Sequence, residues 1–519
     1  MGIALGLVSI AGAQAPQQPT PTTGTQPAPA QAAPGQADIY PEADRWRVLL
    51  PGAGVRPRTP LYDPYNANVL KGDYPIYGDN LFFFLNATVD SFAVFKRNLD
   101  FFTSDRIRNV PYHEHNLLGQ ITATAAFELF HGDTVFTPKD WAIRLTPIAR
   151  FRCGDKNAID QGCGEDIRMF EAFGEVKLFE IGQTFDATSA RIGLQAFNAD
   201  FFGLIYNDVQ PGARIFGELE RNRYKFNLAF FDRLNKEKLS GLNEFKRREH
   251  KVFAASVQLD DFAMPGFNLL PFYVFSHDDG FVGGGEVRAH YLGVESTGRI
   301  SRFNVNTAFV YVGGHTANNT PLKRQEEISA GMAFAQVAYP IGFWNPRLAV
   351  AYATGDADPT DGNANGFDSV FDNVNFGGGQ FSYLFGEKIQ LGATTVLRGN
   401  SIFPSLRGAN ATSQYVNPGV MAVNPGVDVA LTPKTLFEAN YNYVRFENTS
   451  SLEFALKRRN VRQSVGHEVN AGVTYRPFLN EQVILFGGAA VFLPDEAIKD
   501  TFGTDTPVYK FIARLILTF

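Results

Sequence analysis

The last residues of the chain, 508–519, alternate between two kinds of side chain. One face of the strand that this alternation predicts carries Tyr509, Phe511, Ala513, Leu515, Leu517 and Phe519. The other face carries Lys510, Arg514 and Thr518. In water, an apolar face that ends in an aromatic residue would promote aggregation. In an outer membrane the apolar face contacts lipid and the polar face borders a lumen, so this ending predicts a strand of a transmembrane β-barrel.

The same alternation recurs from about residue 81 onward, in segments about as long as a membrane-spanning strand. The clearest segments are 120–129, 141–152, 169–179, 224–231, 251–259, 303–311, 388–398, 436–446, 469–476 and 482–492. Short predicted links alternate with long ones, as periplasmic turns alternate with external loops in such barrels. We therefore expect an all-β fold, a transmembrane antiparallel β-barrel of about 18–20 strands over residues 79–519, in the outer membrane of a Gram-negative bacterium. The count of 20 strands treats residues 378–386 as a strand, and the count of 18 treats them as part of a loop.

The composition of the 519 residues excludes or disfavours two other classes of protein. No run of about 18 apolar residues occurs, which excludes a helical membrane protein. The formal charge of −6 disfavours a nucleic-acid-binding protein, because such proteins carry an excess of basic residues. The 48 Phe, 19 Tyr and 49 Gly are typical of strands, aromatic girdles and turns.

The N-terminal region divides into three segments before the barrel. Residues 1–15 have the apolar run and small residues of a secretory signal peptide, with cleavage expected after Ala13. The usual basic start is missing, so we expect the true start to lie upstream; the alternative is a short buried apolar segment. Residues 16–36, rich in Pro, Gln, Ala and Thr, predict a flexible linker, and residues 37–78 predict a periplasmic segment at the barrel mouth.

The chain has two cysteines, Cys153 and Cys163, which bracket a stretch rich in Gly, Asp and Asn. In an exported protein such a pair predicts a disulfide that closes a surface loop. The spacing suits neither a redox pair nor a zinc site, and no histidine lies nearby in the sequence.

When the polar face of each predicted strand is assigned to the lumen, the lining has more basic than acidic residues. The basic residues predicted to line the pore are Arg144, Arg150, Arg152, Arg191, Arg214, Lys225, Arg288, Arg398, Arg476 and Arg514. Rings of Arg and Lys favour anions, and the forked guanidinium group suits carboxylates. The alternative is that these charges only solvate the wall and pair with acidic neighbours. A shift of one residue in a predicted strand would exchange its two faces.

Residues 351–362 read AYATGDADPTDG, and Phe367 and Asp368 follow them. This stretch resembles the strand and loop of alginate-export-type outer-membrane proteins, and residues 190–245 are loosely similar to the same family. The resemblance implies a large monomeric barrel with a basic lumen, a passive pore for diffusion or export of hydrophilic, saccharide-like anions. The alternatives are a barrel that forms a structural sleeve around a periplasmic or electron-transfer partner and, less favoured, a barrel enzyme.

The same stretch contains several side-chain oxygen donors close together in the sequence. They are Asp356, Asp358, Asp361, Asn363 and Asp368. Hard cations such as Ca²⁺ bind oxygen clusters of this kind, so this predicted external loop is a candidate calcium site. The segment lacks the closing Glu and the flanking helices of the helical calcium loop, and Asx-rich turns are common in external loops. The sequence predicts no other cofactor.

Two clusters that contain histidine bear on the question of catalysis. The run 113–115, His-Glu-His, lies in the first predicted external loop with no third metal ligand evident. The run 276–279, Ser-His-Asp-Asp, lies at a strand end, and neighbours in sequence do not make a triad, because the fold makes that geometry. Neither G-x-S-x-G nor H-E-x-x-H occurs. No catalytic residue is therefore predicted.

The expected partners follow from the predicted outer-membrane location. Phe519 resembles the terminal signal that the barrel assembly machinery reads. The basic runs 246–248 and 457–459 lie in predicted external loops, where they are suited to the phosphates of lipopolysaccharide or to funnelling anions, with plain solvated charge as the alternative. Residues 16–78 are suited to contact with a periplasmic partner, and no nucleic-acid partner is expected.

Overall fold

The computed structural model describes residues 68–99, 115–132, 138–154, 162–181, 186–237, 240–280, 285–317, 322–373, 376–387, 410–478 and 482–519. Several predictions fall on residues outside these ranges. They concern the signal peptide 1–15, the linker 16–36, most of the segment 37–78, the strand 388–398 and Arg398.

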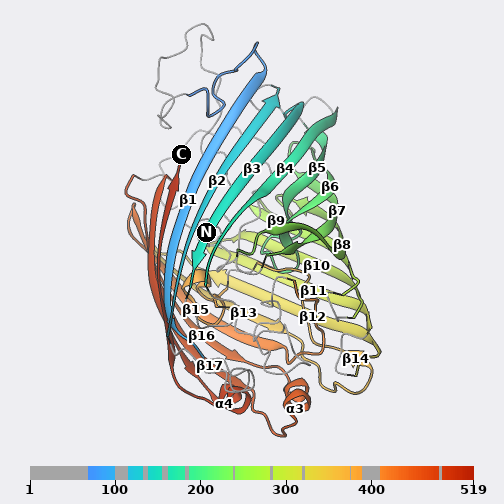
Figure 1. Ribbon diagram of the computed structural model, residues 1–519, viewed down its shortest axis with the longest axis vertical. Coiled ribbons are helices and arrows are strands. Elements are labelled where there is room, and N and C mark those ends of the chain that lie inside the picture. Colours follow the sequence, from blue (N-terminus) through green and yellow to red (C-terminus); the bar gives the residue numbers. More distant parts are fainter. Residues whose placement is uncertain are drawn as a thin grey trace.

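The described residues form a closed antiparallel β-barrel of 18 long strands (Figure 1). The strands are β1 (Leu81–Arg97), β2 (His115–His131), β3 (Trp141–Cys153), β4 (Cys163–Ile181), β5 (Asp186–Asn198), β6 (Asn207–Leu219), β7 (Tyr224–Lys236), β8 (Asn243–Leu259), β9 (Phe267–Asp278), β10 (Val287–Ile300), β11 (Phe303–Ala317), β12 (Gln325–Ala338), β13 (Trp344–Ala353), β15 (Val420–Thr432), β16 (Thr435–Arg445), β17 (Ser464–Tyr475), β18 (Val483–Pro494) and β19 (Val508–Thr518). β14 (Asn363–Ala364) is a short strand that pairs in parallel with β12. The first and last strands pair with each other, from Thr88 with Thr518 to Lys96 with Lys510, and this pairing closes the ring. The predicted fold class is therefore confirmed, at the lower of the two strand numbers.

Alternation along each strand separates an outer apolar face from an inner face. In β19, Phe511 and Leu517 are exposed on the outside, whereas Lys510, Ile512 and Arg514 are buried on the inside. Large aromatic side chains are exposed near the rim where the turns are short, namely Phe303, Phe343, Trp344 and Phe478. A closed barrel leaves no strand edge unpaired in lipid. Together with the apolar outer band, this closure is the architecture of a bacterial outer-membrane protein.

Connection length differs between the two rims of the barrel. The β10–β11 turn (301–302) and the β15–β16 turn (433–434) contain two residues each. At the opposite rim, 446–463 includes helix α3 (Ser450–Leu456) and 495–507 includes helix α4 (Glu496–Phe502). This asymmetry was expected from the sequence, and it assigns the rim with long connections to the cell exterior.

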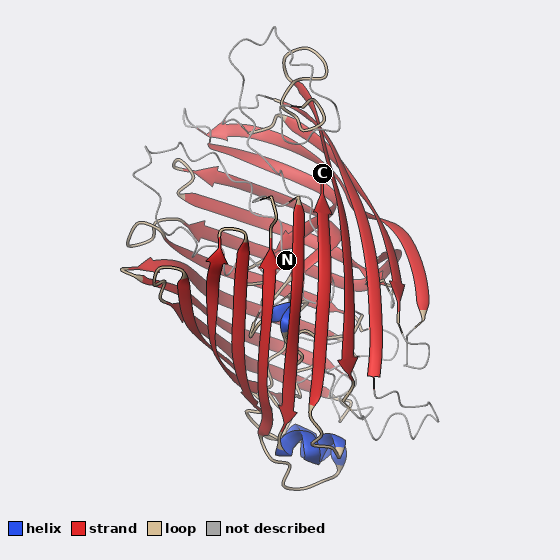
Figure 2. Ribbon diagram, turned by 90° about the vertical axis from the view of Figure 1, so that its left-hand side faces the viewer, coloured by secondary structure: helices blue, strands red, loops and turns tan. Residues whose placement is uncertain are grey.

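The longest connection, residues 354–419 between β13 and β15, is called the inner loop below, and its described stretches 364–373, 376–387 and 410–419 pack inside the barrel. Its short helix η1 (Gly379–Phe381) contacts β17, β18 and β19. Figure 2 shows this helix among the strands, whereas the other two helices lie beyond one rim. Among the described residues, no helix combines the length and the apolarity that a membrane crossing requires.

The inner loop corrects one prediction. The alternating residues of 378–386, Phe381, Tyr383 and Phe385 among them, do not form a strand. These side chains are buried, because they face the inner wall of the barrel rather than lipid. The alternation therefore correctly indicated that one set of side chains is buried in an apolar environment. It did not show that this environment is the inner wall of the barrel rather than lipid. The 20-strand count, which included 378–386, is wrong.

The largest apolar cluster lies between the inner loop and the barrel wall. The ring of Phe376 packs against Phe334 of β12 at 6.2 Å, and Phe367 packs against Tyr291 of β10 at 6.4 Å. The β5–β6 connection also contacts the inner loop, since the N–H of Phe371 donates to the carbonyl of Ile205 at 3.0 Å. The inner loop and the β5–β6 connection thus narrow the interior of the barrel on this side. The polar part of the inner wall is the candidate functional site.

Candidate functional site in the barrel lumen

The middle of the inner loop is held by asparagine side chains on the inner face of the barrel. The carbonyl of Gly377 accepts hydrogen bonds from Asn442 (2.7 Å) and Asn470 (2.8 Å). Asn440 in turn donates to Asn470 at 3.0 Å. Glu468 accepts the backbone N–H groups of the residues that follow η1, at 2.7–2.9 Å. These bonds satisfy backbone groups that would otherwise lie unpaired in a buried segment.

Glycines allow the inner loop to approach the wall this closely. Gly378 has a φ of 99°, and a Cβ placed there would lie 2.1 Å from Asn470 Oδ1. On the wall, a Cβ at Gly488 would lie 2.2 Å from the ring of Phe381, and one at Gly472 would lie 2.4 Å from it. The run of three glycines at 377–379 is the sequence signal that reports this close contact.

A cluster of charges fixes the end of the loop beside the seam between β19 and β1. Lys510 donates to the carbonyl of Gln380 at 2.7 Å and pairs with Glu387 at 2.7 Å. Lys96 also pairs with Glu387. Burial alone would raise the pKa of Glu387, but the two lysine charges and their hydrogen bonds lower it to about 2.

Arg514, one of the predicted pore residues, lies in the same cluster and faces inward. Its guanidinium donates to both carboxylate oxygens of Asp90, at 2.7 and 2.9 Å, and to the side-chain oxygen of Gln380 at 2.8 Å. Arg514 is 6% exposed. Its positive charge is therefore balanced, and its role is to join the seam to the inner loop.

A second set of predicted residues lies on the inner faces of β3, β5 and β6. These residues are Arg144, Arg150, Arg152, Arg191 and Arg214. On β3, Arg144 lies 3.1 Å from Glu171 and 3.6 Å from Glu128. Arg150 donates to the carbonyl of Ser240 and to the hydroxyl of Thr122 (3.3 Å). The three arginines of β3 are spaced so that they share one face of the strand.

Arg191 and Arg214 are direct register partners on β5 and β6, so their guanidinium groups lie on the same inner face. Arg191 donates to Glu175 at 2.8 Å, whereas Arg214 has no ion pair with a carboxylate of the described residues. The guanidinium of Arg214 lies 4.2 Å from the centre of the Phe216 ring, and that of Arg191 lies 4.2 Å from the Phe173 ring. Of these two neighbouring cations, therefore, only Arg191 forms an ion pair within the described residues.

The other predicted pore residues have different surroundings. Lys225 pairs with Asp260 at 2.8 Å near the periplasmic rim, and Arg476 lies directly after the end of β17. Arg288 does not line the lumen, so that prediction is wrong: its side chain is 46% exposed on the outer face of β10. The opposite set, which includes Val287 and Tyr291, is apolar and packs against the inner loop. The apolar face of this strand end therefore points inward.

Several buried charges that sequence reasoning missed lie on the inner face of β6–β9. Asp208 pairs with Arg233 at 3.1 Å and with Lys236 at 2.7 Å. Arg248 forms a two-pronged ion pair with Asp278, at 2.7 and 2.9 Å. The basic run 246–248 was assigned to an external loop, but it belongs to β8, and its last member is buried. Residues 246–251 are all polar, so the alternation of apolar and polar residues could not have revealed that β8 extends through this run.

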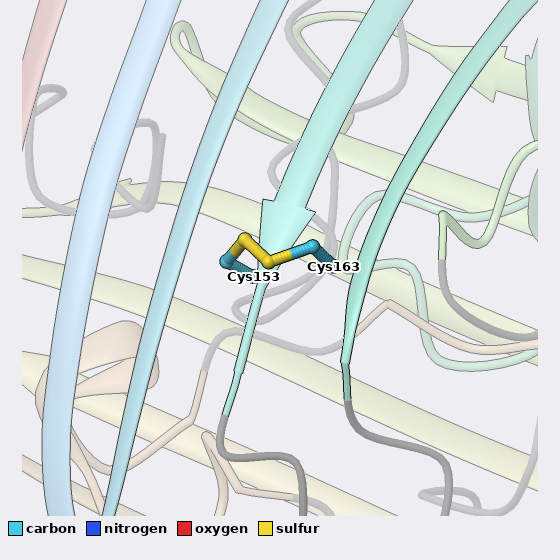
Figure 3. Close-up of a disulfide and its surroundings, with 2 residues drawn as sticks. All are labelled: Cys153 and Cys163. Carbon is cyan, nitrogen blue, oxygen red and sulfur yellow. A yellow bond between two sulfur atoms is a disulfide. The ribbon is translucent and has the colours of Figure 1, made fainter.

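Cys153 and Cys163, the pair expected to be bonded, form a disulfide between β3 and β4 (Figure 3). The two residues are also register partners at the external ends of their strands. The bond closes the β3–β4 connection next to Arg152 and so holds the external end of the basic face of β3.

Among the described residues, no three of the four candidate aspartates Asp356, Asp358, Asp361 and Asp368 lie within reach of one metal ion. Asp358 accepts hydrogen bonds from Thr360 in an exposed turn, and Asp361 accepts from Asn363 at 2.7 Å. Asp368 is buried and accepts from backbone N–H groups of the inner loop. In the part of the chain that the structure describes, the one group of three metal-ligating side chains lies elsewhere, at the β9–β10 connection.

Asp356 gives a prediction about pH. Burial, with the charges of Asp361 and Glu326, raises the pKa of Asp356 from 3.8 to about 7. Between pH 3.8 and about pH 7, Asp356 is ionised in the unfolded chain but keeps its proton in the folded protein. The free energy of unfolding therefore falls as the pH rises through this range. Asp356→Asn cannot ionise. We expect it to stabilise the barrel at pH 8 relative to pH 4, by up to about 4 kcal/mol, measured by urea unfolding at both values. An equal effect at both pH values would contradict this assignment.

Comparison with known proteins gave structural neighbours only. No family model matches the chain, and no curated protein matches it. OccK2 (OpdF) of Pseudomonas aeruginosa is 9% identical over 84% of this chain and 97% of its own, with a TM-score of 0.47. The outer membrane protein opdK of the same organism is 11% identical over 84% and 99%, with a TM-score of 0.45. A variant of OccD1 (OprD) is 10% identical over 88% and 100%, with a TM-score of 0.49. At these identities the likeness is one of barrel architecture alone.

Proposed function

We propose that the protein is an outer-membrane pore through which small hydrophilic anions diffuse or are exported, with carboxylated saccharides as the solute class. The observation that carries this proposal is the pair Arg191 and Arg214, two neighbouring inward cations of which only Arg191 forms an ion pair, with Glu175, among the described residues. The arginines of β3 extend the basic wall beyond this pair. The resemblance of 351–368 to alginate-export-type proteins supports a saccharide as the solute.

The chemistry of the wall accounts for anion preference. A guanidinium group offers forked N–H donors that match both oxygens of a carboxylate, and it stays charged at all physiological pH values. In a narrow lumen with protein walls, a fixed positive charge raises the local anion concentration and lowers that of cations. A solute carboxylate would exchange part of its hydration shell for these donors and then move on to the next.

We favour a pore over a sleeve around a partner protein because the inner loop occupies the interior. The loop contacts the inner wall at β10, at β17 and at the β19–β1 seam, as the bonds of Tyr291, Glu468 and Lys510 show. A protein segment inside the barrel would have to displace these buried contacts. A small solute needs only the space along the basic wall.

Arg214→Ala tests the proposal directly. Removing this cation should lower the anion-to-cation permeability ratio by roughly half, because its charge is not balanced by an ion pair. The measurement is the reversal potential in a salt gradient across a planar bilayer. Arg288→Ala removes the same charge from the outer face and serves as the matched control. Equal shifts for both variants, or none for Arg214→Ala, would contradict the proposed role.

Two partner predictions belong to this proposal. We propose that the barrel assembly machinery reads the C-terminal Phe519, which follows β19 and pairs with Ala87 of β1 through its N–H at 2.8 Å. We also propose lipopolysaccharide as the lipid neighbour of the external rim, where Arg247 is exposed. A calcium ion at 356–368 remains an expectation that thermal melts with calcium and with chelator would test.

A further inference from the structure

Three metal-ligating side chains meet on the external rim, outside the lumen. They are His277 at the end of β9, Asp279 just beyond it, and Glu286 directly before β10. His277 Nε2 lies 2.9 Å from Asp279 Oδ1 and 3.2 Å from Glu286 Oε1. The three donor atoms all lie within 4.8 Å of one another. One imidazole and two carboxylates therefore converge on one point.

The strand pairing fixes this arrangement. His277 is the register partner of Arg288, so the ends of β9 and β10 are held side by side at this level. Asp279 is tied as well, because its N–H donates to the carbonyl of Glu249 at 3.1 Å. The side chains of His277, Asp279 and Glu286 are 24%, 45% and 34% exposed, so an ion from outside can reach all three. The ligands come from two strands that the barrel already aligns.

Arg288 supplies a supporting contact to the cluster. Its Nε pairs with Glu286 and orients that carboxylate toward His277. Carboxylate ligands in metal sites are commonly held by such an outer hydrogen bond.

We propose that His277, Asp279 and Glu286 bind a divalent transition-metal ion of the zinc class. Ligand bonds of about 2.0–2.2 Å in tetrahedral geometry place neighbouring donor atoms about 3.3–3.6 Å apart, so the distances of 2.9 and 3.2 Å need to widen by only a few tenths of an ångström. Mixed imidazole and carboxylate ligands suit Zn²⁺ better than Ca²⁺ or Mg²⁺, which take oxygen ligands. Three protein ligands leave a fourth position open to water. The bound ion would clamp the external ends of β9 and β10 together.

The test is isothermal titration of the full chain in detergent with ZnCl₂. All proteins in the test, the variants included, also carry the background His113→Ala/His115→Ala, which removes the one pair of histidines that lie close together in the sequence. We expect one site, and we expect His277→Ala and Asp279→Asn each to weaken binding by more than about tenfold. The matched control is His131→Ala, which removes a histidine that pairs with one carboxylate, Asp140, at 2.8 Å near the opposite rim.

Each outcome of the titration decides the proposal. Loss of the site in both ligand variants, with His131→Ala unchanged, would support it. Absence of a site in the background protein, or equal affinity after His277→Ala, would overturn it. A difference in gel migration between heated and unheated samples shows that each variant has folded. A second readout is the melting temperature, which should rise with Zn²⁺ only in proteins that keep the site.

Discussion

Replacement of residues 376–387 by a short Gly/Ser linker is expected to raise the single-channel conductance several times. This segment lies against the inner wall, held by Asn442, Asn470 and Glu468 and by the Lys510–Glu387 ion pair. A barrel of 18 strands without such an obstruction encloses a wide aqueous channel. Removing the segment should therefore widen the path and weaken selectivity at the same time. The measurement is conductance in a planar bilayer.

The control for this experiment lies outside the barrel. Replacing α3 (Ser450–Leu456) by a linker of the same kind changes a connection beyond the external rim, and it should leave the conductance nearly unchanged. If the 376–387 replacement folds and conducts as the unmodified protein does, the inner loop does not limit the pore.

Asp90→Ala is expected to destabilise the barrel by about 3–5 kcal/mol. Asp90 is fully buried and accepts both prongs of Arg514, so its removal leaves a guanidinium charge in the wall with no carboxylate to balance it. The loss should appear as a lower urea midpoint for unfolding from lipid vesicles. The double variant Asp90→Ala/Arg514→Met removes both charges and should recover most of the loss.

An exposed ion pair provides the comparison. Asp505 pairs with Lys499 at 2.6 Å on the surface, with both side chains more than half exposed. Exposed pairs contribute little to stability, so Asp505→Ala should leave the urea midpoint nearly unchanged. If Asp90→Ala and Asp505→Ala lowered the urea midpoint equally, burial would not determine how much the Asp90–Arg514 ion pair contributes to stability.

The barrel itself was predictable because lipid and lumen impose opposite demands on alternate residues. In β19 the sequence assigns Phe511 and Leu517 to lipid and Lys510 and Arg514 to the inside, and the structure agrees. The short turns were predictable for a similar reason, since two-residue links such as 433–434 leave room for a tight turn only. The sequence pattern of a segment was sufficient to predict its structure wherever the surroundings of that segment did not depend on distant parts of the chain.

The inner loop could not be predicted in this way. Once a loop packs inside the barrel, part of the inner wall becomes apolar, and the lumen is no longer one aqueous environment. Phe381 and Tyr383 then alternate like strand residues although they face protein. Arg288 was assigned to the wrong face for the same reason, because Tyr291 on the opposite face packs against the loop. Only long-range contacts identify which apolar face meets lipid.

The candidate site was found in part. The arginines of β3, β5 and β6 were named from alternation, but their ion pairs depend on neighbours across strands, such as Glu175 beside Arg191. The sequence therefore could not distinguish the balanced Arg514 from Arg214, which has no carboxylate partner in the described part of the chain. Register between strands, which sets these pairs, is a property of the whole sheet.

The measurement that tests the central claim most directly is the ion selectivity of the refolded protein in a planar bilayer. The basic wall around Arg191 and Arg214 predicts a stable conductance with higher permeability for anions than for cations. A folded barrel whose current is carried mainly by cations, or one that carries no current, would contradict the proposal that this protein is an anion pore.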